Sequence, residues 1–169
     1  MKVKKPALLG LLTAIALTIF LVEAQIPAIV PIPGVKIGLA NIVTVFTVFA
    51  IGTGEGAAVL ACRIFLGAVF AGNFSTIFYS AAGGLLAILA TAGLKRILTR
   101  QQLWVTGALG AAAHSVGQMA AAILISGTPG LIAYLPVMIA ISIITGLFTG
   151  SCAQILLNRG DKLWKTIFG

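Results

Sequence analysis

The most constraining feature of this sequence is its division into six long apolar segments separated by short breaks. The segments lie at about 6–23, 36–51, 57–71, 75–94, 104–125 and 131–157. The breaks read EAQIPAIVPIPG, GTGEG, AGNFS, KRILTRQQ and SGTPG, and each holds the glycine, proline or asparagine that turns need. Because about 20 apolar residues cross a bilayer as a helix, the pattern predicts six transmembrane helices.

The composition excludes a soluble protein. Hydrophobic residues make up 60% of the 169 residues and charged residues 8%, whereas soluble domains carry about 25% charged residues. In lipid every backbone polar group must be bonded within the protein, so the fold class expected is an all-α bundle, one integral membrane domain over residues 1–169. The second and third segments are short, and we expect thin or tilted crossings or a fused, partly re-entrant hairpin.

The basic residues predict the orientation in the membrane. Six crossings place both termini on one side, together with nine of the 11 Lys and Arg residues: Lys2, Lys4, Lys5, Lys95, Arg96, Arg100, Arg159, Lys162 and Lys165. The positive-inside rule then predicts cytoplasmic N and C termini. Anionic lipid headgroups account for the net charge of +8 without any nucleic acid as a partner.

The N-terminal segment and the cysteines each allow a second interpretation. The start of the chain has the basic and apolar regions of a signal peptide, but the run from Pro6 to Val22 is long for that role. We therefore predict a first transmembrane helix. Cys62 and Cys152 lie inside apolar segments, so we expect packed thiols rather than a disulfide or a metal site.

Polar side chains at membrane depth are the candidates for function, because they are costly there. The candidates for ligand binding are Lys36, Asn41, Arg63, Asn73, Ser80, His114 and Gln118. Lys36 and Arg63 have no obvious acidic partner, since Glu55 lies about two helical turns from Arg63 and Glu23 falls in the opposite connection. An anionic ligand group would neutralise both. Alternatively, Lys36 snorkels to the headgroups and Arg63 pairs with Glu55 or with helix-terminal carbonyls.

The remaining candidates also have structural alternatives. His114 and Gln118 are four residues apart and share one helix face, for ligand contact or for an interhelical hydrogen bond. Asn73 and Ser80 lie near the outer end of their segments, where either one caps a helix. The loop EAQIPAIVPIPG is a candidate lid over the site.

Several kinds of chemistry are not supported by the sequence. The chain has no GxxxxGK[ST] phosphate loop, no aspartate-rich motif for magnesium and no second histidine. GTGEG reads as a hairpin turn, and no nucleophile–base pair is visible. We therefore predict a protein that is not an enzyme and binds no metal or cofactor. Small-residue pairs, as in Gly10/Ala14, Gly52/Gly56 and Gly146/Gly150, predict close helix packing or contact with another subunit.

Four stretches carry a family resemblance. PGVKIGLANIV, Arg63 with FLGAVFAGN after it, YSAAGG and GAAAHSVGQ resemble the bacterial Gx transporter family, often labelled heptaprenyl diphosphate synthase component I. That family is similar to the S components of energy-coupling factor (ECF) importers, six-helix subunits that work with a T subunit and two cytoplasmic ATPases. The resemblance implies a bacterial cytoplasmic membrane protein, with Gly10 and Ala14 as the positions that contact the T subunit.

Three functions are compatible with these observations. The leading hypothesis is the substrate-binding subunit of an importer for a small anionic metabolite or vitamin, with ATP bound by its partners. The second is a non-catalytic membrane accessory component of prenyl diphosphate or quinone synthesis, or of flavin-linked electron transfer. The third is a membrane scaffold whose polar residues only tie helices together.

Overall fold

The computed structural model describes residues 4–26 and 38–168, and the side chains of residues 5–26 and 38–160. This part of the chain is helical and contains no strand, as predicted. Its elements are α1 (Lys4–Glu23), α2 (Asn41–Ala50), α3 (Thr53–Phe70), α4 (Thr76–Leu94), the 3-10 helix η1 (Arg100–Gln102), α5 (Leu103–Ser126), the 3-10 helix η2 (Pro129–Tyr134) and α6 (Leu135–Phe168).

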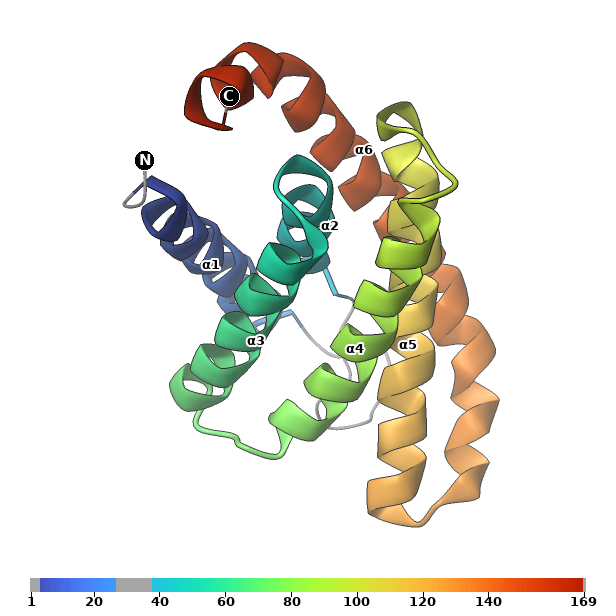
Figure 1. Ribbon diagram of the computed structural model, residues 1–169. Helices are drawn as coiled ribbons and strands as arrows, with labels where there is room; N and C mark the ends of the chain where they lie inside the picture. Colours follow the sequence, from blue (N-terminus) through green and yellow to red (C-terminus); the bar gives the residue numbers. More distant parts are fainter. Residues whose placement is uncertain (1–3, 27–37, 169) are drawn as a thin grey trace.

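The helices form a bundle around α2. In Figure 1, α4, α5 and α6 lie side by side in one half of the molecule, and α1 packs with α3 in the other half. The start of α1 and the end of α6 lie at the same end of the bundle (Figure 1). Large apolar side chains cover the outside, including Phe65, Leu124 and Phe148, which are 60%, 82% and 65% exposed. Such an apolar exterior is typical of a surface that contacts lipid.

Five of the six α-helices are long and apolar enough to cross a membrane, and α2 is the exception. The prediction that residues 36–51 form a crossing is wrong in its length, because α2 begins only at Asn41 and spans 10 residues. A helix of that length is about 15 Å long, half the thickness of a bilayer core. It contacts all five other α-helices, and eight of its residues are buried. Its apolar sequence therefore reflects burial among other helices and not contact with lipid. A helix that is apolar on all sides fits either environment, so the sequence alone does not distinguish them.

The connection between α2 and α3 is a tight turn, as predicted. Only Ile51 and Gly52 separate the two helices, and most of GTGEG forms the first turn of α3. Gly56 lies against α2, where an added Cβ would overlap the side chain of Val48. α2 and α3 thus form the fused hairpin that was one of the two expectations for these segments.

Glycine also sets the contact between α5 and its neighbours. A Cβ at Gly150 of α6 would fall 2.8 Å from the Cα of Trp104 of α5, and one at Gly146 would fall 2.7 Å from the Cα of Ala108. A Cβ at Gly117 of α5 would fall 2.8 Å from the Cα of Gly83 of α4. The backbones of α4, α5 and α6 therefore touch directly, and the predicted packing role of Gly146/Gly150 is confirmed.

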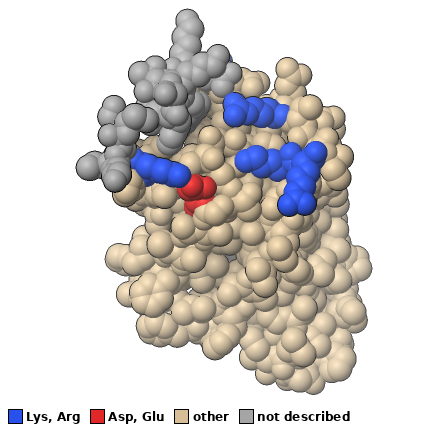
Figure 2. Space-filling model, viewed as in Figure 1, with Lys and Arg blue, Asp and Glu red and all other residues tan. Residues whose placement is uncertain are grey.

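The charged side chains lie at one end of the bundle. Figure 2 shows Lys and Arg side chains, and an acidic group among them, near the end where α1 starts and α6 ends. Lys5 of α1 forms an ion pair with Glu55 of α3 at 2.5 Å. Lys95, at the end of α4, donates a hydrogen bond at 2.5 Å to the backbone oxygen of Val48 near the C-terminal end of α2. Its positive charge stabilises the negative end of the α2 dipole. This end of the hairpin is thus held by cations from two other helices.

Two further expectations need correction. α6 continues to Phe168, beyond the predicted limit at 157, and is longer than a bilayer core requires. Cys62 is exposed on the outside of the bundle rather than packed, because it lies on the outward face of α3; Cys152 is half-buried, and both thiols are free.

Candidate functional site

Arg63 is a charge buried among the apolar helices. It lies at mid-length in α3 and is only 4% exposed. The ring of Phe20 of α1 covers its guanidinium at 5.5 Å. Within the described part of the chain, its Nε and Nη2 atoms are buried and have no hydrogen-bond partner. Because buried donors are nearly always bonded, two unpaired nitrogens on one guanidinium indicate a place for an acceptor from elsewhere.

Glu23 is a member of this site that sequence reasoning missed. It ends α1 and is 4% exposed, so it lies in the interior and not in the outer connection. Phe20 and Glu23 are three residues apart and project from one face of α1, which packs on α3. Glu23 therefore lies on the side of α1 that faces Arg63, although no ion pair joins them among the described residues. The signal available in the sequence was an acid at the end of an apolar helix, in a chain with three acids.

The sequence alternative that pairs Arg63 with Glu55 is wrong. Glu55 lies in the first turn of α3, at the charged end, and its carboxylate binds Lys5. Eight residues of helix, about 12 Å, separate it from Arg63.

His114 and Gln118 share one buried face of α5, as predicted. They are 4% and 1% exposed, and both lie against Gly83 of α4. A Cβ at Gly83 would fall 2.9 Å from Cε1 of His114 and 2.8 Å from Cγ of Gln118, so glycine makes room for both side chains. His114 Nδ1 and Gln118 Oε1 have no partner among the described residues.

Asn41 completes the group from α2. It is 7% exposed, and its Nδ2 atom has no hydrogen-bond partner within the described ranges. Gly38, in the turn before α2, has a φ of +88° and donates its N–H to Oε1 of Glu23 at 2.5 Å. A Cβ at Gly38 would fall 3.1 Å from Nδ2 of Asn41 and 3.7 Å from Cδ2 of His114. Groups from α1, α2 and α5 thus meet around Gly38.

We name these side chains the polar interior site: Glu23, Asn41, Arg63, His114 and Gln118. Four helices contribute to it, and each contributes a charged or hydrogen-bonding group that is at least nine-tenths buried. It contains one cation, one acid and three neutral groups that donate or accept hydrogen bonds. The arrangement is suited to binding a small polar molecule and not to a covalent reaction, since no nucleophile–base pair forms part of it.

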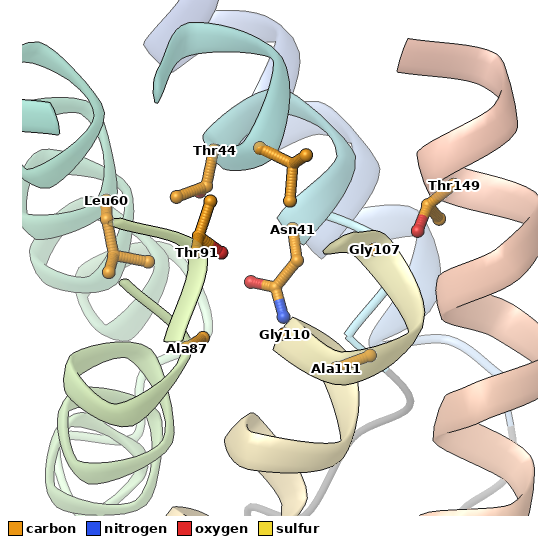
Figure 3. Close-up of a pocket in the computed structure, with 10 residues that line it drawn as sticks. Asn41, Thr44, Leu60, Ala87, Thr91, Gly107, Gly110, Ala111 and Thr149 are labelled. Atoms are coloured by element: carbon orange, nitrogen blue, oxygen red, sulfur yellow. The ribbon is translucent and has the colours of Figure 1, made fainter. Parts of the chain in front are cut away.

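A small cavity adjoins the site on the side of Asn41 (Figure 3). It lies between α2, α4, α5 and α6 and is lined by the hydroxyl-bearing side chains of Thr44, Thr91 and Thr149. The volume open to the centre of a water molecule is about 10 Å³, which is the room that a single water needs. The buried hydroxyl of Thr44 has no partner among the described residues, so a water is well placed to bond to it and to Asn41.

The other predicted site residues are Lys36, Asn73 and Ser80, with Gly10 and Ala14 as the predicted partner-docking positions. Lys36 and most of the candidate lid fall outside the described ranges. Asn73 is exposed in the turn before α4, where its Oδ1 accepts hydrogen bonds from the N–H of Ser75 at 3.1 Å and its hydroxyl at 2.6 Å. Ser80 is buried on α4, three residues before Gly83. Gly10 and Ala14 lie on an exposed face of α1, and a Cβ at Gly10 would meet nothing within 4 Å.

Across the described ranges, no group of three or more His, Cys, Asp or Glu residues is placed to hold a metal ion.

The fold and the site define a class of protein: a polytopic α-helical membrane protein with a buried polar site between its helices. The model of the family described as heptaprenyl diphosphate synthase component I matches residues 12–156. The chain therefore belongs to that family. No curated protein and no solved structure matches it at a significant level.

Proposed function

We propose that this protein is the substrate-binding membrane subunit of an importer, comparable to the S component of an energy-coupling factor system. The substrate is a small metabolite or vitamin with an anionic group. The observation that supports this most strongly is Arg63, a buried guanidinium whose Nε and Nη2 atoms lack acceptors in the described part of the chain. A carboxylate or phosphate oxygen matches that fork in geometry and in charge.

The neighbouring groups add direction to this binding. His114 Nδ1, Gln118 Oε1 and Asn41 Nδ2 each have an unused hydrogen-bonding position. A site that bonds several polar atoms of a ligand rejects analogues that lack them, because the site's own buried groups are then left unpaired.

In this function the protein has cytoplasmic termini and works with partner subunits. The Lys and Arg side chains gathered where α1 begins and α6 ends favour a cytoplasmic location for both termini in a bacterial inner membrane. A T subunit and cytoplasmic ATPases would supply the energy, because the sequence contains no phosphate loop of its own. The open face of α1 at Gly10 and Ala14 is the surface proposed for the T subunit.

A second candidate function follows from the family's description. In it, the protein is a non-catalytic membrane component that holds a prenyl diphosphate for a separate synthase. Catalysis would belong to the partner, because magnesium–diphosphate chemistry needs several carboxylates and this chain has three acidic residues.

Native mass spectrometry of the gently purified protein tests both. We expect a bound water-soluble anionic metabolite in the wild type and its loss in Arg63→Gln, with Arg96→Gln as the matched control at the charged end. A prenyl diphosphate in the wild type would select the second function. Equal retention in Arg63→Gln and the control would contradict the site.

A further inference from the structure

The polar interior site contains two opposite charges that do not touch. Arg63 and Glu23 are each 4% exposed, and Phe20, one turn before Glu23 on α1, covers the guanidinium at 5.5 Å, yet no ion pair joins the two charges among the described residues. Two buried charges held near each other without contact retain much of their desolvation cost, because direct pairing and further hydrogen bonds are what offset it. The described side chains therefore do not by themselves offset the cost of burying both charges.

Each charge is only partly satisfied by the chain itself. The Nε and Nη2 atoms of Arg63 have no hydrogen-bond partner, and the hydrogen bond to Glu23 in the described structure comes from the Gly38 N–H to Oε1. A carboxylate accepts several hydrogen bonds, so one backbone N–H leaves capacity for a further donor. Asn41 Nδ2 and the ring of His114 lie beside Gly38, the residue that bonds Glu23, and Gln118 follows His114 by one turn of α5. Asn41 Nδ2, His114 Nδ1 and Gln118 Oε1 also lack partners among the described residues.

The acid limits what Arg63 can accept. A diphosphate or other polyanion at Arg63 would place like charges near Glu23 in a poorly screened interior, which is strongly unfavourable. A molecule with an anionic group and an ammonium group satisfies both side chains at once.

We propose that the substrate is a small zwitterion, with its anionic group at Arg63 and its ammonium group at Glu23, and that Glu23 determines this specificity. The inference rests on the proposed binding function and names the substrate class for the same site. Glu23 also stabilises the fold, because its carboxylate accepts a hydrogen bond from Gly38 in the turn that precedes α2.

The experiment separates molecules by charge class, so the substrate does not have to be identified first. A bacterial metabolite extract is divided by ion exchange into zwitterionic, purely anionic and purely cationic pools. Each pool is added to the detergent-purified protein, and the melting temperature is measured, since a ligand that binds the folded state raises it. Wild type is expected to respond to the zwitterionic pool above all.

The variants assign the response to the two charges. Glu23→Gln keeps an acceptor for Gly38 and removes the charge, so it should require about 10-fold or more of the zwitterionic pool for the same shift. Glu23→Asp keeps the charge and should retain the preference. Arg63→Gln should respond to no pool, and Glu55→Gln, which removes an equal charge at the far end, should behave as wild type.

The outcomes distinguish failure of the zwitterion inference from failure of the binding function. A wild-type response to the anionic pool that Glu23→Gln leaves unchanged would overturn the zwitterion inference and leave the binding function standing. No response of the wild type to any pool would contradict the binding function and the inference with it; buried waters would then satisfy the two charges.

Discussion

At the scale of single residues, the site depends on a charge pair that sequence spacing conceals. Arg63 and Glu23 belong to α3 and α1, and Phe20 lies over the guanidinium from the same helix as Glu23. An arginine inside a membrane protein is costly unless other groups offset its charge. Glu23 reduces the cost of burying Arg63, and the unpaired Nε and Nη2 atoms of Arg63 show that part of this cost remains.

A double-mutant cycle between Arg63 and Glu23 measures this coupling. Arg63→Met should destabilise the protein, because it leaves Glu23 as a buried charge, and adding Glu23→Gln should restore stability. The expected interaction energy is about 0.5–3 kcal/mol, read from equilibrium unfolding in mild detergent. The pair Arg63→Met and Glu55→Gln serves as the control and should be additive; non-additivity of equal size there would contradict a local coupling.

Gly83 is the residue that makes room for the α5 side chains. Gly83→Ala should destabilise the protein by about 1–3 kcal/mol and weaken ligand binding, because the new methyl group would press on the His114 carbonyl and on Gln118, each 2.8 Å away. Thermal unfolding and the binding assay check both effects. Gly93→Ala in the same helix meets nothing within 4 Å and should be neutral or stabilising.

At the scale of the elements, α5 is the helix against which both of its neighbours pack by backbone contact. Glycines at the α4–α5 and α5–α6 crossings bring the helices close enough for dispersion forces, which must replace the hydrophobic effect between helices in lipid. The buried hydroxyls of Ser115 and Ser142 add a hydrogen bond across the second crossing.

Gly150→Val tests the α5–α6 crossing. Even one added carbon at this position would lie 2.8 Å from the Cα of Trp104, which cannot move aside as a flexible side chain can. We expect a loss of stability of about 1–3 kcal/mol or more, measured as detergent-resistant folded protein after heating. Gly130→Val, in η2 with open space around it, is the control; equal loss at both positions would show that the effect is not one of packing.

At the scale of the whole molecule, the described cations outside the interior mark one end of the bundle, and the turn at Asn73 marks the other. Cysteines introduced at Arg96 and Asn73, both exposed, should therefore differ in their access to an impermeant maleimide in intact cells. We expect Asn73→Cys to react from outside and Arg96→Cys to react only after permeabilisation. Both belong in a background with Cys62 and Cys152 changed to serine; the reverse pattern would contradict cytoplasmic termini.

The candidate site was partly predictable for a local reason. Arg63, Asn41, His114 and Gln118 stand out because each is polar within an apolar segment, and His114 and Gln118 share a face by helical spacing alone. Glu23 was not predictable as a site residue, because its position at the edge of a segment is equally compatible with an exposed connection. Asn73 is polar in the same way, yet it lies in a turn and bonds Ser75.

The sequence by itself determined the medium, the all-helical class, the glycine-rich breaks and the ends of most helices, because these depend on hydropathy and on local turn chemistry over neighbouring residues. Only the tertiary structure decided that α2 is a short helix surrounded by five others, and that Glu23 and Arg63 share an interior site. The hydropathy of an apolar side chain is the same whether lipid or protein surrounds it, so it does not show which of the two covers α2. Contacts between helices that are distant in sequence are set by their packing in three dimensions.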